Sequence, residues 1–156
     1  MFRPREIVYG YARWFREPHN KYLVTIYQDE ELNIVACFTT SKDRAGVPPE
    51  RIRHGAVSSP EGCEAYVFER GRTIGTNPET GEPFSFPLRT TVTFDYGVRE
   101  AQRDFFVQEF TGAKVVCVLN EEEYMNLVYA MYISPHTSER HRKVLDRIMQ
   151  EHYGRQ

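Results

Sequence analysis

The sequence lacks the motifs that identify most metal centres and nucleotide-binding sites. None of its three cysteines belongs to a C-x-x-C pair, and no two of its five histidines have the spacing of a helical ligand pair. Neither of the common phosphate-binding loops occurs, and no G-x-S-x-G elbow marks a hydrolytic serine. The sequence therefore predicts no bound metal, no cofactor and no hydrolytic triad.

Features of membrane and secreted proteins are also missing. No apolar run approaches the length of a membrane span, and residues 1–6 lead into a strand without the apolar core of a signal peptide. Two of the three cysteines, Cys37 and Cys117, lie within apolar strand patterns, which is typical of reduced, buried thiols. We expect a cytoplasmic protein with no membrane partner.

Neither sign of charge dominates the chain. The formal net charge is −2, so binding to nucleic acid would require a local basic patch. Aromatic residues are plentiful: ten Tyr and ten Phe favour sheet over a helical bundle. With 156 residues, 40% of them hydrophobic, the chain is long enough to form one domain with its own core.

Apolar patterning predicts that strands precede helices. Residues 22–27 and 32–38 are apolar on both faces, and the short polar connector between them predicts an antiparallel hairpin. Residues 88–95 alternate with a period of two, which predicts a polar face carrying Arg89, Thr91, Thr93 and Asp95. Further strands are predicted over 7–14, 64–70, 102–110 and 114–119.

Helices are predicted only toward the end of the chain. Asn120 followed by Glu123 fits a capping pattern, and Ser134-Pro135 predicts the start of a second helix. The segments 41–62 and 71–87 are rich in turn residues and are predicted to be long loops. The fold class is therefore mainly β (α+β), a single domain over 1–156, with a small, partly open antiparallel barrel at about 7–119 and C-terminal helices at about 120–152.

Polar residues gather at one edge of the predicted hairpin. His19 and Lys21 open the first strand, and the hydroxyl triplet Thr39–Ser41 ends the second. Because the strands are antiparallel, these residues are expected to lie near one another. The hairpin therefore predicts a cluster of polar groups at the edge of a buried sheet.

The residue types in this cluster suit the cleavage of RNA without a metal ion. That reaction needs a base for the 2′-hydroxyl proton, a proton donor for the leaving 5′-oxygen and donors to the phosphate. His19 can act as acid or base near neutral pH, and Thr40 can donate to phosphate. The other candidates are cations for the phosphate and polar groups for the substrate: Lys21, Arg44, Arg89, Thr39, Ser41 and Asp95.

A purely structural interpretation is open for each of these residues. His19 follows Pro18, and a histidine in that position is more often a turn residue than a catalyst; the hydroxyl triplet can satisfy backbone groups at a strand end. Arg89 and Asp95 can form part of a solvated face with cross-strand partners. No residue of the set, taken alone, establishes a function.

Taken together, these segments resemble the MazF/PemK-like toxins of bacterial type II toxin–antitoxin systems. The matching stretches are 18–24, 34–41 and, more loosely, 88–96. The family's usual Arg-Pro at the start of the second strand stands here as Lys21-Tyr22, which keeps the positive charge but loses the planar fork of arginine.

The resemblance implies an SH3-like barrel that forms a homodimer and cleaves single-stranded RNA without metal, with a protein antitoxin as partner. It places Lys21 and Thr40 where the family has its catalytic basic and hydroxyl residues, with His19, Arg89 and Asp95 nearby. Two other classes stay open on the same barrel: a non-catalytic interaction module or decayed toxin, and a small-molecule-binding barrel with an enclosed apolar cavity.

Overall fold

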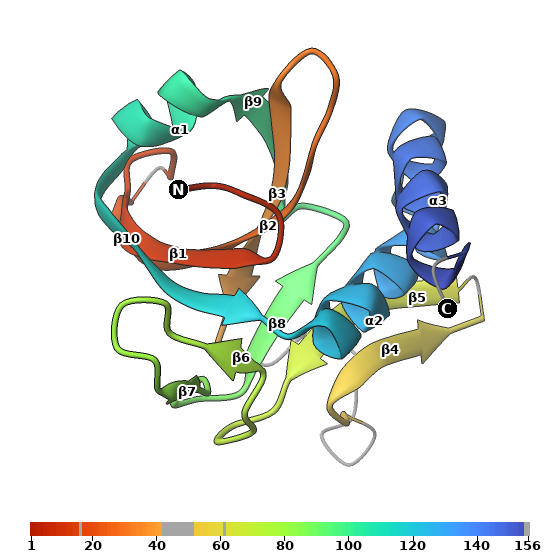
Figure 1. Ribbon diagram of the computed structural model, residues 1–156, viewed down its shortest axis with the longest axis horizontal. Coiled ribbons are helices and arrows are strands. Elements are labelled where there is room, and N and C mark those ends of the chain that lie inside the picture. The colour runs from red at the N-terminus through yellow and green to blue at the C-terminus, as the bar shows by residue number, and fades with distance from the viewer. Residues whose placement is uncertain (16, 42–51, 61, 155–156) are drawn as a thin grey trace.

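The computed structural model describes residues 1–15, 17–41, 52–60 and 62–154. The fold is mainly β: one antiparallel sheet curls into a half-barrel, and two helices follow it at the C-terminal end of the chain (Figure 1). The predicted class, a partly open antiparallel barrel with C-terminal helices, is confirmed.

The strand order of the sheet places the first strand, β1, next to the last strand, β10. Its strands run β4-β5-β8-β3-β2-β1-β10-β6-β7, and β9 pairs with β3 beside β8. The strands are β1 (Glu6–Ala12), β2 (His19–Gln28), β3 (Asn33–Thr40), β4 (Gly55–Ser59), β5 (Gly62–Phe68), β6 (Gly75–Thr76), β7 (Pro83–Phe84), β8 (Thr90–Thr93), β9 (Val98–Gln102) and β10 (Phe110–Leu119).

The β2–β3 hairpin forms as predicted, with Leu23 opposite Phe38 and Val24 opposite Cys37. Both faces of the hairpin are buried because each one faces a different core. Val24 and Cys37 belong to the core covered by the C-terminal helices, whereas Leu23 and Phe38 belong to a second core. This double burial explains why the two strands are apolar on both faces.

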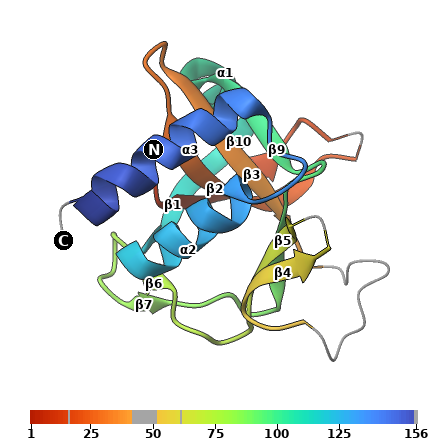
Figure 2. The same ribbon diagram turned by 90° about the vertical axis from the view of Figure 1, so that its right-hand side faces the viewer.

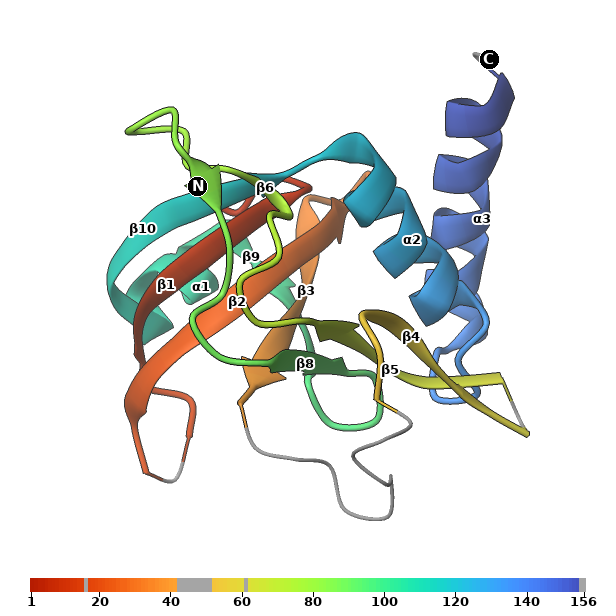
Figure 3. The same ribbon diagram turned by 90° about the horizontal axis from the view of Figure 1, so that it is seen from below.

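The helices α2 (Glu121–Tyr132) and α3 (Glu139–Gly154) lie on one side of the sheet (Figure 2). Seen from below, β1, β2 and β10 form a curved layer, with α2 and α3 on the opposite side of the molecule from β10 (Figure 3). Leu127, Val128 and Met131 of α2 are fully buried against the larger core. The helices therefore cover one face of the half-barrel.

The starts of these two helices show how well capping can be predicted from sequence. The Asn120 side chain accepts a hydrogen bond from the Glu123 N–H at 2.8 Å, which confirms the predicted cap of α2. The start of α3 was predicted at Ser134-Pro135, which is wrong: α3 begins at Glu139. The Ser138 hydroxyl accepts from the His141 N–H at 3.2 Å, so Ser138 is the residue that supplies a capping contact.

A second predicted element is also wrong. Residues 102–110 were predicted as a strand, but α1 (Arg103–Glu109) is a short helix between β9 and β10. Phe106 packs fully buried against the second core, while Phe105 and Val107 stay largely exposed. Short apolar runs fit either a strand or a buried helix face, which is why the pattern was ambiguous.

The predicted loops contain short strands. Within 41–62, β4 pairs with β5, whereas residues 42–51 and 61 lie outside the described residues. Within 71–87, β6 and β7 pair with each other, and β6 also pairs with β10. In the part of the chain that the structure describes, no helix combines the length and apolar character needed to cross a membrane.

Strand β8 is buried on both faces, contrary to the predicted polar face. Thr91 and Thr93 are buried together with Val92, and β8 lies between β5 and β3 in the sheet. Cys37 and Cys117 are buried free thiols, as expected, and Cys63 is a third. Burial raises the pKa of the Cys37 and Cys117 thiols to about 12, so neither is poised as a nucleophile at neutral pH.

Candidate functional site

The candidate site lies where β2 begins and β3 ends, at one edge of the hairpin. His19 pairs with Ala12 and Lys21 with Gly10 on β1, which fixes the start of β2 in the sheet. Two hollows open here and share the side chains of His19, Lys21, Thr39 and Thr40. The predicted cluster is therefore brought together.

The two hollows differ in their remaining walls. The Tyr9 hollow, of about 320 Å³, also contacts Tyr9, Tyr22 and Leu88. The Tyr96 hollow, of about 280 Å³, also contacts Phe15, Tyr96 and Arg99. Among the described residues that line the hollows there is no carboxylate, and Lys21 and Arg99 give the site a positive character.

Lys21 links the two strands of the hairpin. Its Nζ donates a hydrogen bond to the carbonyl oxygen of Thr39 at 2.7 Å, and it lies 5.3 Å from the centroid of the Phe15 ring. The ammonium is half-buried between the two hollows. Its charge is therefore held at a fixed place beside both of them.

The contacts of His19 define its tautomer. Nδ1 lies 2.7 Å from the carbonyl oxygen of Glu17, and because that oxygen can only accept, Nδ1 carries the proton. In the neutral ring Nε2 is then the acceptor, and the described residues give Nε2 no hydrogen bond. The imidazole is exposed and its ring lies 5.2 Å from that of Phe15. His19 therefore presents a basic nitrogen that can take up a proton.

The three hydroxyl residues occupy different positions. Thr39 is buried, and its hydroxyl lies 3.4 Å from the carbonyl oxygen of Tyr22, to which it donates. Thr40 is half-buried and lines both hollows, whereas Ser41 is exposed and lines the Tyr9 hollow. Thr40 is therefore the partly exposed hydroxyl residue that lines both hollows.

Arg89 and Asp95, two further predicted site residues, line neither hollow. Nε and Nη2 of Arg89 each lie 3.1 Å from the Glu69 carboxylate, and this contact holds the pKa of Glu69 below its ordinary value. The Asp95 carboxylate accepts from the Tyr96 N–H at 3.0 Å and is exposed. The remaining candidate, Arg44, lies outside the described residues.

Arg99 is a site residue that the sequence prediction missed. It lies on β9, opposite Ala36 of β3, and this pairing carries its side chain to the Tyr96 hollow. A strand predicted at 102–110 starts too late to include Arg99, because β9 spans Val98–Gln102. Gly97, after a strand with clear alternation, was the available signal that the chain turns back alongside β3.

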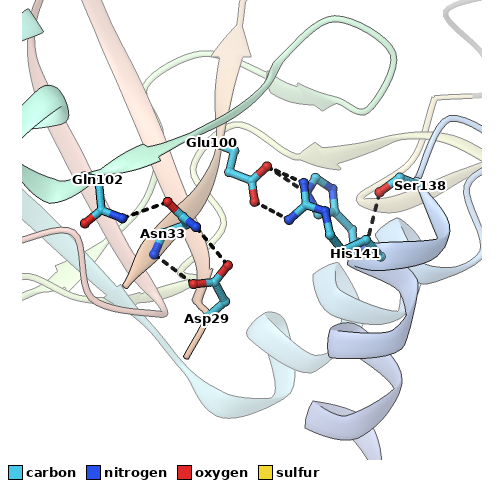
Figure 4. Close-up of polar contacts among 7 residues, drawn as sticks. Asp29, Asn33, Glu100, Gln102, Ser138 and His141 are labelled. Atoms are coloured by element: carbon cyan, nitrogen blue, oxygen red, sulfur yellow. Dashed lines mark hydrogen bonds and ion pairs between the residues drawn. The ribbon is translucent and has the colours of Figure 1, made fainter. Parts of the chain in front are cut away.

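A second polar cluster lies away from the site, between the hairpin turn and α3 (Figure 4). The Glu100 carboxylate accepts two hydrogen bonds from Arg140 and lies 3.6 Å from Nε2 of His141. Beside it, Asn33 is bonded to both Asp29 and Gln102 (Figure 4). These contacts join β9, the turn and α3, and they stabilise the fold around the hairpin.

A third polar group is buried under α2. The Glu123 carboxylate accepts from Tyr66 at 2.7 Å and lies 2.5 Å from Nε2 of His54. The Glu69 N–H donates to Nδ1 of His54, so the proton of the neutral ring is on Nε2 and is donated to Glu123. All of these groups are satisfied within the fold. Among the described residues, no group of three or more His, Cys, Asp and Glu side chains is arranged to hold a metal ion.

Comparison with known proteins found no similar protein. No family model matches the chain, and no match was found among curated proteins or among solved structures. The fold and site define a half-barrel with a cationic, hydroxyl-bearing cluster at the end of a buried hairpin. Function must therefore be inferred from these residues.

Proposed function

We propose that this protein is an endoribonuclease that cleaves single-stranded RNA without a metal ion and acts in the cytoplasm. The observation that carries the proposal is the convergence of His19, Lys21 and Thr40 on two adjoining hollows. A basic nitrogen, an ammonium and a hydroxyl beside an open surface are the groups that transfer of a phosphodiester requires.

The reaction is a transesterification within the RNA. His19 Nε2 takes the proton of a 2′-hydroxyl, the 2′-oxygen forms a bond to phosphorus, and the bond from phosphorus to the 5′-oxygen breaks. Lys21 neutralises the phosphate and supplies a proton to the leaving 5′-oxygen; solvent then restores the proton of Lys21 and takes up the proton that His19 gained. The products are a 2′,3′-cyclic phosphate and a 5′-hydroxyl, and no water is consumed in this step.

A partner protein belongs to the same proposal. Leu88, at the Tyr9 hollow, and Tyr96, at the other, are 57% and 62% exposed. Apolar side chains exposed at the rim of a site are suited to burial by a partner. An antitoxin that covers the hollows, and a second copy of the chain as homodimer partner, follow from the family resemblance.

One observation favours a different function, that of a non-catalytic interaction module. The Lys21 ammonium donates to the Thr39 carbonyl, and the Thr39 hydroxyl is directed at the Tyr22 carbonyl. Polar groups bonded to the backbone of their own hairpin are what a structural role requires. Under this alternative the surface binds a partner and purified protein leaves RNA intact.

The two functions are separated by incubating purified protein with RNA of mixed sequence in EDTA, followed by end-group analysis. The proposal predicts fragments with 2′,3′-cyclic phosphate and 5′-hydroxyl ends. Intact RNA, or fragments with 5′-phosphate ends, would exclude the proposed reaction. RNA in which every 2′-hydroxyl is methylated serves as the control, because it lacks the nucleophile.

A further inference from the structure

The Tyr96 hollow has features that the cleavage step does not use. Its walls combine aromatic side chains with one arginine, and its volume of about 280 Å³ lies at the small end of ligand pockets. Unstacked bases of single-stranded RNA are bound in proteins by aromatic rings and by arginine. A hollow of this size and composition suits a single base.

Tyr96 and Phe15 supply the aromatic surface. Tyr96 lines the hollow and is 62% exposed, so most of its side chain can be covered by a ligand. Phe15 stands on the same hollow between the His19 ring and the Phe38 ring, at centroid distances of 5.2 Å and 4.9 Å. A base bound here would lie next to the groups that act on the phosphate.

Arg99 is held in an orientation that leaves one edge of its guanidinium for a ligand. Nη1 donates to the carbonyl oxygens of Tyr96 at 2.8 Å and Val98 at 3.0 Å, and the guanidinium carbon lies 5.6 Å from the Phe38 ring centroid. Within the described part of the chain, Nε and Nη2 make no hydrogen bond. These two donors form the parallel fork that matches a pair of adjacent acceptors.

We infer that the Tyr96 hollow binds a guanine base adjacent to the cleaved phosphate, with Arg99 donating to O6 and N7 and Tyr96 covering the base. On its Hoogsteen edge guanine presents two adjacent acceptors, O6 and N7, whereas adenine presents a donor in place of O6. The inference rests on the proposed function for the position of the phosphate. Beyond RNA cleavage, it predicts a preference of the site for guanine.

Binding of uncleavable RNA tests this inference separately from catalysis. The probes are fluorescent uridine hexamers, methylated at every 2′-hydroxyl, that carry one central guanine, inosine, 7-deazaguanine or adenine. Fluorescence anisotropy should show guanine and inosine bound equally, because inosine keeps O6 and N7. Adenine and 7-deazaguanine should bind about 5- to 100-fold more weakly, because each lacks one acceptor of the pair.

Variants assign the contact to its residues. Arg99→Lys keeps the charge but loses the fork, so it should bind all four hexamers equally, while Tyr96→Leu should weaken all four by a similar factor. Arg147→Ala and Tyr153→Leu, at exposed positions of α3, serve as matched controls and should match wild type. Thermal unfolding of each variant, followed by circular dichroism, establishes that it is folded.

Three results would overturn the inference. Equal affinity of the wild type for the guanine and 7-deazaguanine hexamers would show that N7 of the base accepts no hydrogen bond from the protein. A uniform loss with Arg99→Lys that preserves the preference for guanine would place Arg99 on phosphate. No binding of any hexamer would exclude a base site. A preference for guanine without cleavage of ordinary RNA would support the guanine site and contradict the proposed function. Cleavage without a preference for guanine would support the proposed function and contradict the guanine site.

Discussion

At the scale of single residues, Lys21 links the structure of the hairpin to its proposed chemistry. The bond from Nζ to the Thr39 carbonyl fixes the ammonium between the two hollows, where a phosphate shared by two nucleotides would lie. Lysine supplies a point charge rather than a planar fork. The planar fork of Arg99, on a different strand, is assigned to a base and not to the phosphate.

Replacing Lys21 should therefore affect cleavage more than folding. We expect Lys21→Met to slow RNA cleavage in EDTA by about 100-fold or more, because the charge that stabilises the phosphate is lost. Lys21→Arg keeps the charge and should stay within about tenfold of wild type. Lys143→Met, at an exposed position of α3, is the matched control. Equal rates for Lys21→Met and wild type would remove Lys21 from the mechanism.

The cluster could be predicted from the sequence because it depends only on the hairpin. Any antiparallel pairing of the two apolar strands brings the start of one to the end of the other, so His19 and Lys21 meet Thr40 whatever the rest of the sheet does. Arg89 and Arg99 depend on longer-range pairing of β8 and β9. Without that pairing, the sequence could not predict that Arg89 forms an ion pair with Glu69 or that Arg99 lines the site.

At the scale of elements, the start of each C-terminal helix is set by local hydrogen bonds. The sequence pattern predicts these bonds for α2 but not for α3. The cap of α2 has a clear signature in Asn120 and Glu123, and the helix begins there. Ser134-Pro135 predicts a start of α3 that is too early, since the helix begins at Glu139. The Thr137 hydroxyl donates to the Met131 carbonyl at 2.6 Å, so this segment completes the end of α2 and does not begin α3.

The cap of α2 gives a prediction about stability. Asn120→Ala should lower the free energy of unfolding by about 1 kcal/mol, because the Glu123 N–H loses its acceptor at the helix start. Urea unfolding followed by circular dichroism measures the change. Asn126→Ala, at an exposed position inside the same helix, is the control and should be neutral or slightly stabilising. An equal loss in both variants would contradict a capping role.

At the scale of the whole molecule, two clusters of polar side chains connect the helices to the half-barrel. Glu100 joins β9 to Arg140 and His141 of α3, and Glu123 of α2 joins Tyr66 and His54. The sequence showed these residues only as scattered charges, since each pair is separated by dozens of positions. The hydrophobic pattern could predict that the helices pack on the sheet, but not which polar contacts fix their position.

The contact of Glu100 with α3 should make stability depend on pH. Hydrogen bonding to Arg140 lowers the pKa of Glu100, so its ionised form is favoured in the folded state. The resulting stabilisation is present above the ordinary carboxyl pKa and is lost as the pH falls through the lowered value. Wild type should therefore unfold at a higher temperature than Glu100→Gln at pH 7, and the difference should vanish in acid.

Calorimetric scans from pH 7 down to pH 3 measure this dependence. Glu151→Gln, at an exposed position near the end of α3, should show no comparable difference at any pH. A gap between wild type and Glu100→Gln that stays constant across the range would show that the charge of Glu100 does not stabilise the fold.

Cleavage of RNA at the end of the β2–β3 hairpin can be tested by one comparison of rates. Wild type, His19→Ala and His136→Ala are incubated in EDTA with a DNA oligonucleotide that contains a single guanine ribonucleotide followed by guanine, so that a guanine lies on each side of the phosphate. We predict one cut, 3′ to the ribonucleotide, by wild type and by His136→Ala, and a rate about 100- to 10,000-fold lower for His19→Ala. Cleavage by His19→Ala at the wild-type rate, or no cleavage by the wild type, would contradict the account.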